Sequence, residues 1–427
     1  MVKQYRLETL ALHAGQDRQE AQLSRGVPVY RTSSFLFKDT EHAANLFALK
    51  EPGNIYTRLM NPTQAILEER VAALEGGKAA LALASGTSAI FYSIINLAKA
   101  GDEIVAANNL YGGTFTMFND ILPQLGIIVR FVKANDFKAL DKIINSRTRA
   151  VFIETIGNPA LEVSDIQKTA DIAHHHKIPL IVDSTFTTPY LSRPIEHGAD
   201  IIVHSLTKWL GGHGAGIGGI VIDAGKFDWT DSKFVLYNEP DSSYHGIRYA
   251  HDLGDLNPVA YALRMRLVPL RNLGAAISPD NAWIFLQGLE TLHLRMRAHS
   301  ENALKAAMYL NDHPKVDWVK YPGLASEADN KIIAEKYLKN GYGGMVVFGI
   351  KGGKESGEKF INRLELFSHV ANVGDAKSLA IHPASTTHSQ LSKAAQAKGG
   401  ISPELIRLSI GIEHIDDILA DIDQALA

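Results

Sequence analysis

A lysine lies at the centre of the stretch best suited to chemistry, His204-Ser205-Leu206-Thr207-Lys208-Trp209-Leu210. An apolar segment, 199–203, precedes this stretch and a glycine-rich loop, 211–219, follows it. Burial between a strand and a loop lowers the pKa of an amine and makes it a nucleophile able to form a Schiff base. The hydroxyls of Ser205 and Thr207 are suited to holding a phosphate. The combination indicates pyridoxal phosphate, although a lone lysine here is more often a loop residue that extends to solvent.

The ring of this cofactor needs a buried carboxylate that keeps its pyridine nitrogen protonated. Asp183 follows the apolar run Leu180-Ile181-Val182, at the point where a predicted strand ends. A carboxylate there is sheltered from water. Taken alone, an aspartate at this position equally fits a cap on the following turn.

The phosphate needs backbone N–H groups at the start of a helix. Ser85-Gly86-Thr87-Ser88 lies between an apolar run, 79–84, and a predicted helix that begins near Ala89. This segment therefore predicts a phosphate site. Taken alone, it also fits a helix start capped by Ser85.

Two further residues match the needs of an amino-acid substrate on this cofactor. Tyr111, in Tyr111-Gly112-Gly113-Thr114, follows a predicted strand and can stack on the ring, although a tyrosine beside a turn is commonly a packing residue. Arg407 lies in the apolar segment 405–409. A buried arginine needs a carboxylate, which an amino acid supplies in bidentate geometry; the alternative is an internal salt bridge.

These residues must be positioned by strands and helices of one sheet. Several short apolar runs without polar alternation are separated by helix-like stretches, which predicts a mostly parallel sheet covered on both faces. One such stretch is 164–177, which Ser164 is expected to cap. Ligands bind at the carboxyl ends of such strands. The predicted strands are Glu103–Ala107, Ile127–Val132, Ala150–Glu154, Pro179–Val182, Asp200–Val203 and Ile217–Ile222.

A chain of 427 residues predicts more than one domain. Residues 1–60 lack periodicity and form an arm that cannot build its own core. Residues 61–275 are the expected cofactor-binding domain, which opens with a helix. In this helix Asn61 is the expected cap, Pro62 is the first residue, Gln64 completes a capping box, and Gly76-Gly77 ends the helix. Residues 226–275 are expected to be irregular. The C-terminal domain, 276–427, is expected to open with one long helix over 281–310 and to include a strand at 344–349.

Composition excludes several classes of function. The net charge of −3 gives no reason to expect nucleic acid or an anionic membrane as partner, and no cysteine is present for disulfides, thiolate metal sites or nucleophilic catalysis. No signal sequence or membrane-spanning helix is predicted, so we expect a cytoplasmic protein.

Two motifs are expected to be coincidental. Gly214, Gly216 and Gly219 match the dinucleotide fingerprint, but they precede a predicted strand instead of following one. His174-His175-His176 cannot converge on one metal ion, because consecutive helical residues point in different directions. No metal is expected.

Together the motifs resemble the fold-type-I pyridoxal-phosphate enzymes of cysteine and methionine metabolism, through nearly the whole chain. The resemblance implies an aspartate-aminotransferase-like α/β fold, with a large, mostly parallel sheet domain and a smaller C-terminal α+β domain. Besides the stretches around Ser85, Tyr111 and Lys208, it rests on Tyr56-Thr57-Arg58, Asn61-Pro62-Thr63, Glu154-Thr155-Ile156-Gly157-Asn158-Pro159, Val182-Asp183-Ser184-Thr185-Phe186 and Ile406-Arg407-Leu408-Ser409-Ile410-Gly411.

The resemblance also implies roles for individual residues. Lys208 forms the Schiff base, Asp183 pairs with the pyridine nitrogen, and Tyr111 stacks on the ring and assists proton transfer. The residues that bind the substrate are Arg407, Ser378 and Asn158. Asn158 also contacts the cofactor hydroxyl. Tyr56 and Arg58 reach the phosphate of a neighbouring subunit, which implies a homo-oligomer, namely a tetramer built from dimers that share active sites. The phosphate residues of the subunit itself are Ser85, Gly86, Thr87, Ser205 and Thr207.

Within the family, four stretches favour γ-replacement, in which sulfide or a thiol displaces acetate from O-acetylhomoserine. They are 7–15, 211–214, 371–379 and 382–388. Cystathionine γ-synthase, O-succinylhomoserine sulfhydrylase and methionine γ-lyase chemistry remain alternatives. Gly113 stands where methionine γ-lyases typically have cysteine, and Ala380-Ile381-His382 lacks the acidic residue of many cystathionine γ-lyases. Outside these enzymes, a cofactor-binding regulator and an NAD-dependent oxidoreductase are the competing classes.

Overall fold

The predicted strands in the first half of the chain form one seven-stranded sheet in the computed structural model, which describes residues 5–16, 24–386 and 400–427. The strand order is β1-β7-β6-β5-β4-β2-β3, and β7 alone runs antiparallel to its neighbours. The mostly parallel sheet is thereby confirmed. The strands are β1 (Ala79–Leu83), β2 (Glu103–Ala107), β3 (Ile128–Val132), β4 (Thr148–Glu154), β5 (Leu180–Asp183), β6 (Ile201–Ser205) and β7 (Gly219–Asp223).

Burial along these strands follows their place in the sheet. Every residue of β2 and β4 is buried, as expected for strands inside a parallel sheet. In contrast, β3 is partly exposed because it forms the edge. The helices packed on or beside this sheet include α3 (Pro62–Glu75), α4 (Gly86–Ile95), α5 (Gly112–Thr116), α6 (Phe137–Ile143), α7 (Ile166–His175), α8 (Thr188–Leu191) and α12 (Pro279–Glu290).

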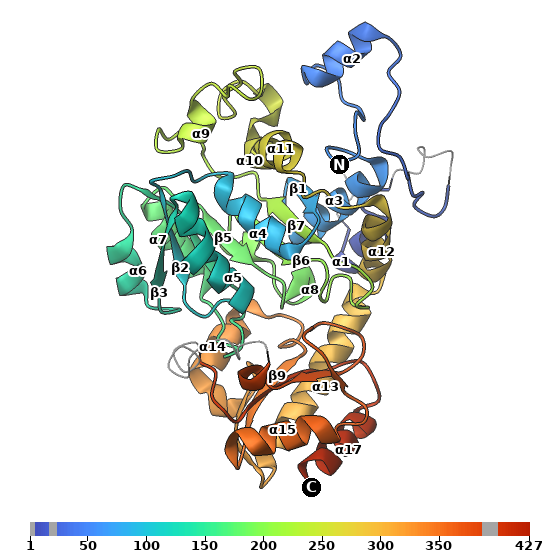
Figure 1. The fold of residues 1–427 in the computed structure, drawn as a ribbon, viewed down its shortest axis with the longest axis vertical. Coiled ribbons are helices and arrows are strands. Elements are labelled where there is room, and N and C mark those ends of the chain that lie inside the picture. Colours follow the sequence, from blue (N-terminus) through green and yellow to red (C-terminus); the bar gives the residue numbers. More distant parts are fainter. Residues whose placement is uncertain (1–4, 17–23, 387–399) are drawn as a thin grey trace.

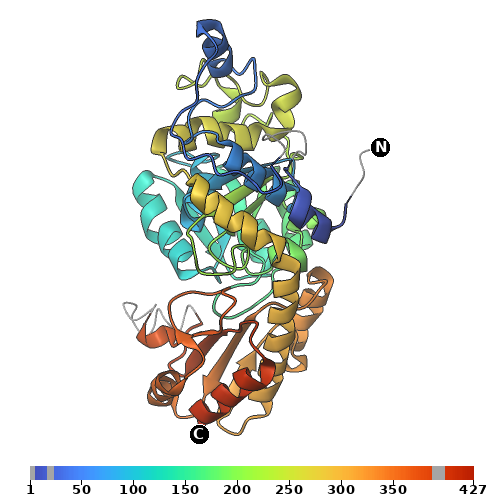
Figure 2. The same ribbon diagram turned by 90° about the vertical axis from the view of Figure 1, so that its right-hand side faces the viewer.

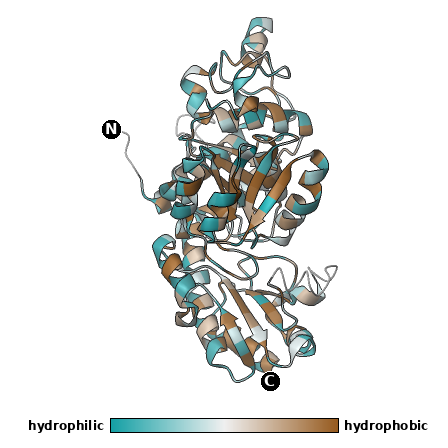
Figure 3. Cartoon of the chain, turned by 90° about the vertical axis from the view of Figure 1, so that its left-hand side faces the viewer, coloured by the Kyte–Doolittle hydropathy of each residue, from teal (hydrophilic) through white to brown (hydrophobic). Residues whose placement is uncertain are grey.

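A second sheet of five strands lies in the C-terminal part, in the order β10-β11-β12-β9-β8 (Figure 1). Figure 3 shows apolar strands in both sheets, with polar residues on the outer faces of the helices. The strands are β8 (Val316–Lys320), β9 (Met345–Ile350), β10 (Ser368–His369), β11 (Leu379–Ile381) and β12 (Leu405–Ser409), and the accompanying helices are α13 (Leu292–Asp312), α14 (Ala328–Tyr337), α15 (Gly353–Arg363) and α17 (Ile415–Leu426). The buried residues form two clusters, and along α13 Met296 belongs to the first and Ala303 to the second, although the first also includes Met345 and Val347 of β9. The domain boundary expected at residue 275 stays a prediction.

The helix predicted over 281–310 is wrong as a single element. It is two helices, α12 and α13, which break at Thr291. Figure 2 shows the change of direction at this point. No glycine or proline stands at Thr291, and the apolar periodicity continues across it. The sequence therefore predicts one helix instead of two.

The start of α3 agrees with the prediction only in part. Asn61 accepts a hydrogen bond from the amide of Thr63, Pro62 is first, and Gly76 ends the helix in the left-handed conformation, with φ +78°. The capping box does not form. Gln64 turns away instead and donates through Nε2 to the carbonyl of Ile277 at 2.5 Å.

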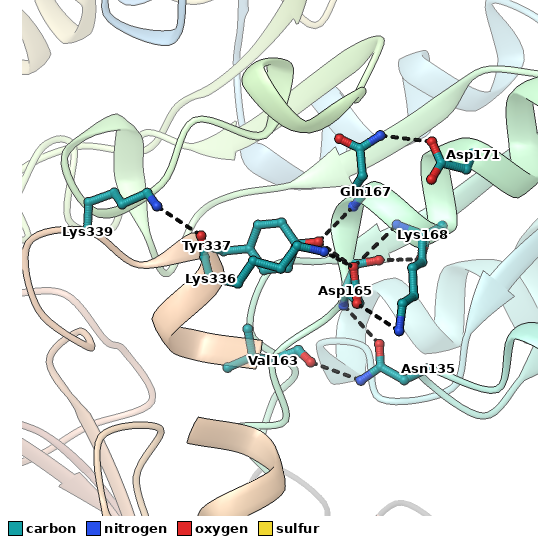
Figure 4. A network of polar contacts seen from close by, with 10 residues as sticks. Asn135, Val163, Asp165, Gln167, Lys168, Asp171, Lys336, Tyr337 and Lys339 are labelled. Atoms are coloured by element: carbon teal, nitrogen blue, oxygen red, sulfur yellow. Dashed lines mark hydrogen bonds and ion pairs between the residues drawn. The ribbon is translucent and has the colours of Figure 1, made fainter. Parts of the chain in front are cut away.

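The start of α7 also differs from the sequence prediction. Its cap is Asp165, not Ser164, whose hydroxyl donates to the carbonyl of Glu154. Asp165 also binds the hydroxyl of Tyr337 and, at 3.1 Å, Lys336 Nζ, both from α14 (Figure 4). A buried carboxylate with two partners from another element makes a stronger anchor than a serine hydroxyl.

The region 226–275 is less irregular than expected. After the short α9 (Val235–Asn238), residues 254–273 form one nearly continuous helical stretch: a 3-10 turn (Gly254–Val259), α10 (Ala260–Met265), a π-helical turn (Arg266–Leu270) and α11 (Arg271–Leu273).

The arm carries two helices, α1 (Leu7–His13) and α2 (Thr40–Phe47), and α2 projects beyond the rest of the chain (Figure 2). Only Leu46 is buried in α2, and Leu36 beside it is 98% exposed. An arm with this little buried surface agrees with the expectation that it lacks a core of its own.

Among the described helices, none combines the length and the apolar character needed to cross a membrane.

Candidate active site

Several of the residues singled out in the sequence lie at one edge of the seven-stranded sheet. Parallel strands end at the same edge, so residues that follow β1, β2, β4, β5 and β6 are brought together there. These residues are Ser85 after β1, Tyr111 after β2, Glu154 at the end of β4, Asp183 at the end of β5, and Ser205 at the end of β6 with Lys208 in the following turn.

Lys208 is half-buried, and its Nζ donates to Asn372 Oδ1 at 2.5 Å. Burial lowers the pKa of Lys208 to about 8, and the positive charge of Arg407 acts in the same direction. A larger share of the amine is therefore neutral near neutral pH than in an exposed lysine. This environment suits the nucleophile that the sequence predicts at Lys208, and the role itself stays a prediction.

We expect the rate at which the apo-protein attaches pyridoxal phosphate covalently to rise with pH and to level off above about 8. Only the neutral amine attacks an aldehyde, and the lowered pKa of Lys208 makes that form dominant above about 8. The growth of visible absorbance after mixing, followed from pH 6 to 10.5, measures this rate. A rate that keeps rising toward the ordinary lysine pKa of 10.5 contradicts the assigned environment.

Asp183 and Glu154 lie side by side, because the two strand-end residues pair in register between β4 and β5. The amide of Thr185 donates to Asp183 Oδ1 at 3.0 Å, and burial raises the pKa of Asp183. Burial, followed by the charge of Asp183, raises the pKa of Glu154 well above its ordinary value. Two adjacent carboxyl groups therefore favour one proton or one cation beside them.

Glu154 also fixes the segment that carries Tyr111. Its Oε1 accepts a hydrogen bond from the backbone amide of Tyr111 at 2.6 Å. The ring of Tyr111 is 52% exposed, so it is free to cover a ligand. Gly113 allows this ring position, because a Cβ there would lie 2.6 Å from Tyr111 Cε1.

The start of α4 lies against the end of β6 and has the groups that an anion needs. Ser85 caps the helix by accepting from the amide of Ser88, so the amides of Gly86 and Thr87 have no partner within the helix. A Cβ on Gly86 would lie 2.7 Å from Cβ of Ser205, so only glycine brings helix and serine this close. Thr207 Oγ1 accepts from the amide of Gly218 at 3.1 Å. Helix amides and hydroxyls at one point suit a phosphate.

Arg407 comes from β12 of the second sheet and is buried. Its Nη1 donates to Asn158 Oδ1 at 3.3 Å, and within the described part of the chain no carboxylate forms an ion pair with it. Burial lowers the pKa of Arg407 to about 10, which Tyr111 partly offsets. The internal salt bridge considered for Arg407 is therefore not formed by those residues. A buried guanidinium without an anion is a site for a carboxylate.

The sequence profile of the Cys/Met metabolism PLP-dependent enzymes matches residues 8–427. The chain belongs to this pyridoxal-phosphate-dependent family. The predicted cofactor and family are thereby confirmed.

Relatives and solved structures cover the chain from end to end. O-acetyl-L-homoserine sulfhydrylase of Leptospira meyeri is 53% identical over 432 residues, covering 100% of this chain and 98% of the relative. Homocysteine synthase of Schizosaccharomyces pombe is 51% identical over 428 residues, with 100% and 99% covered. A Campylobacter jejuni structure, assigned as an O-acetylhomoserine (thiol)-lyase, superposes with a TM-score of 0.94 at 42% identity over 99% of this chain and 100% of that one. That structure contains N'-pyridoxyl-lysine-5'-monophosphate.

The geometry of this chain fits the family's cofactor. The helix start at Gly86 and the hydroxyls of Ser205 and Thr207 suit its phosphate, and the raised pKa of Asp183 suits a protonated pyridine nitrogen beside it. Lys208 provides a buried amine with a lowered pKa. These groups come from the ends of β5 and β6, the turn after β6 and the start of α4, at the same edge of the sheet.

Three residues implied by the family resemblance are not brought to Lys208 within one chain. Tyr56 and Arg58 are exposed on the arm, where the Arg58 guanidinium lies 5.2 Å from the centre of the Tyr56 ring. Ser378 is fully buried, and its hydroxyl donates to Glu413 at 2.9 Å and accepts from the amide of Gly411. The substrate role of Ser378 stays a prediction. Of the stretch 382–388, residues 387 and 388 lie outside the described residues.

Sequence reasoning missed two residues of the site, Asn372 and Glu154. Asn372 stands 164 positions from Lys208, and the stretch 371–379 that contains it stands out only for its resemblance to the family, not as a contact of the lysine. Glu154 had a usable signal, because it ends a predicted strand next to the strand that ends in Asp183.

The two motifs rejected in the sequence have other structural roles. Gly219 opens β7, so the glycine pattern precedes a strand. His174 binds Asp200 at 2.8 Å and His176 binds Asp141 at 2.7 Å, so the neighbouring imidazoles turn to different carboxylates.

Proposed function

We propose that this pyridoxal-phosphate enzyme replaces the acetate of O-acetylhomoserine with sulfide, which yields homocysteine and acetate. The observation that carries an amino-acid substrate is the buried Arg407, which forms no ion pair with a carboxylate of the described residues and lies close enough to Lys208 to lower its pKa. The choice of O-acetylhomoserine is supported by relatives at 53% and 51% identity, named O-acetyl-L-homoserine sulfhydrylase and homocysteine synthase.

The site residues divide the tasks of the proposed reaction between them. Pyridoxal phosphate, when bound, supplies an aldehyde that condenses with amines and a ring that withdraws electrons. Asp183 holds a proton on the pyridine nitrogen. Arg407, with Asn158 beside it, binds the substrate carboxylate, which fixes the α-carbon next to Lys208.

Lys208 and Tyr111 move the protons. Lys208 removes the α-proton and then carries protons to and from the β-carbon, a task that suits an amine with a pKa of about 8. The Cγ–O bond breaks with its electron pair on acetate, and the sulfur of sulfide forms the new bond at Cγ. Tyr111 covers the ring and assists as acid or base. Ser85, Gly86, Thr87, Ser205 and Thr207 hold the phosphate.

Turnover of three acyl donors with sulfide tests the proposed substrate. We expect kcat/KM to be highest for O-acetylhomoserine, lower for O-succinylhomoserine, whose acyl group adds a carboxylate, and lowest for O-acetylserine, whose shorter chain places the ester one carbon away. A preference for O-succinylhomoserine moves the assignment to a sister activity. Release of methanethiol from methionine at a comparable rate moves it to γ-elimination.

We further propose that two chains share each active site, through Tyr56 and Arg58 of a neighbouring arm. The exposed arm, with Leu36 98% exposed, supports this arrangement. The tetrameric assembly and the cytoplasmic location stay predictions.

Mixing two inactive variants tests the shared site. Lys208→Ala and Arg58→Ala homo-oligomers are each expected to be nearly inactive, because each lacks one component of every site. After denaturation and refolding together, a hybrid contains one site with both native residues. We expect up to about a quarter of wild-type activity in a one-to-one mixture, for random pairing of two dimer sites. No recovery in verified hybrids contradicts a shared site.

A further inference from the structure

Arg295 is a buried arginine that holds the turn carrying Lys208. It lies in the first turn of α13 and is only 4% exposed. Its Nη1 donates to the carbonyl of Trp209 at 2.8 Å, and its Nη2 donates to the carbonyls of Leu210 at 3.3 Å and Gly288 at 2.6 Å. Two of these carbonyls belong to the residues directly after Lys208.

Arg295 also contacts a side chain at the junction of the two helices. Its Nε donates to Thr291 Oγ1 at 3.2 Å, at the break between α12 and α13. In the described ranges, no carboxylate lies within ion-pair distance of the guanidinium. A buried charge without a counter-ion is costly, and here carbonyl dipoles from the Lys208 turn and from α12 satisfy it.

Glycines leave room for this guanidinium. Gly212 has φ +73°, and a Cβ there would lie 2.0 Å from Arg295 Nη1. The amide of Gly212 donates to the carbonyl of Lys208 at 2.7 Å, so the turn closes around the lysine. A Cβ on Gly288 would lie 2.3 Å from the carbonyl oxygen of Gly211. The turn and the two helices are therefore packed at backbone distance around one side chain.

We propose that Arg295 is a positioning residue for the cofactor lysine: it ties the Lys208 turn to the α12–α13 junction and so fixes where the Lys208 amine points. This inference rests on the proposed role of Lys208. Because α13 continues from this junction onto β8 and β9 of the second sheet, Arg295 also connects the lysine to the element that carries the Arg407 sheet.

Arg295→Met tests this role against a matched control, Arg264→Met. Arg264 is also buried, at 6% exposed, and its guanidinium also binds backbone carbonyls, those of Asn96 at 2.8 Å and Leu236 at 3.1 Å. None of these groups belongs to the Lys208 turn. Both variants remove a buried guanidinium of the same kind, so both are expected to lower the melting temperature.

The two variants are expected to differ in two measurements. In Arg295→Met, the rate at which apo-protein attaches pyridoxal phosphate at pH 7 falls, and its pH dependence moves up, because a looser turn hydrates the Lys208 amine. In the reconstituted enzyme, kcat falls by roughly 10- to 100-fold, as expected for a displaced reacting group, and KM changes less. Arg264→Met stays near wild type in both. Arg295→Lys keeps one or two of the hydrogen bonds, so its attachment rate and its kcat are expected to lie between those of wild type and Arg295→Met.

Each outcome decides the inference. An Arg295→Met protein that matches Arg264→Met in attachment rate and kcat overturns it. If Arg295→Met does not fold, Arg295→Lys decides, and wild-type attachment kinetics in that variant overturn it. Failure of the proposed role of Lys208 is recognised by a different result. If another lysine holds the cofactor, Lys208→Ala still attaches pyridoxal phosphate covalently, irrespective of the result for the Arg295 variants.

Discussion

Lys208→Ala is expected to lose covalent attachment of pyridoxal phosphate and to lower kcat by roughly 10⁴-fold or more. Proton transfer by a positioned side chain alone contributes about 10²–10⁴-fold, and this variant also loses the amine that holds the cofactor. The phosphate site at Gly86 and Ser205 is unchanged, so the variant is expected to retain reversible cofactor binding. Visible absorbance after exhaustive dialysis and the rate of homocysteine formation measure the two effects.

Lys233→Ala is the matched control for this variant. Burial lowers the pKa of Lys233 as well, and its Nζ donates to the carbonyl of His176, the residue directly after α7 and away from the cofactor edge. We expect Lys233→Ala to keep both cofactor and turnover. Retained turnover and a dialysis-stable visible band in Lys208→Ala contradict the assignment of the nucleophile.

Arg407→Leu is expected to lower kcat/KM for the amino-acid substrate by roughly 30- to 4000-fold. This factor corresponds to a loss of about 2–5 kcal/mol in transition-state binding. The variant leaves the substrate carboxylate in a buried pocket without its partner, and leucine preserves much of the apolar packing. The loss is expected mainly in KM, because the carboxylate stays bound throughout the reaction. Arg407→Lys keeps the charge but loses the bidentate geometry, so its kcat/KM is expected to lie between those of wild type and Arg407→Leu.

A substrate without a carboxylate provides the control for Arg407. For 3-aminopropyl acetate, wild type and Arg407→Leu are expected to be nearly equal, because the interaction that the variant removes is absent from this substrate. Loss of the same size with both substrates shows a structural role and contradicts carboxylate binding. The visible band of the bound cofactor is expected to persist in Arg407→Leu, since β12 lies outside the phosphate site.

The strand ends explain why much of the site is predictable from the sequence. A parallel sheet collects whatever follows its strands at one edge, so Ser85, Asp183 and Lys208 are brought together by topology alone. Short apolar runs locate the strands, and residue type indicates the chemistry. No knowledge of side-chain contacts is needed for this step.

The remaining residues depend on contacts between distant parts of the chain. Asn372 binds Lys208 from a loop of the second sheet, and Arg295 reaches the Lys208 turn from a helix 85 and 86 positions beyond the residues it binds. The break at Thr291, on which the position of Arg295 depends, has no sequence signal, because the apolar pattern continues through it. For Ser378, the sequence does not show that Glu413 and Gly411 occupy its hydroxyl.

Borohydride reduction of the pyridoxal-phosphate-loaded protein, followed by peptide mapping, tests most directly that the site is built around Lys208. Reduction fixes the cofactor on the lysine that holds it. We predict one pyridoxyl group per chain, on the peptide that contains Lys208, and its loss when O-acetylhomoserine is added before reduction. A pyridoxyl group on any other lysine, or none on Lys208, contradicts the account.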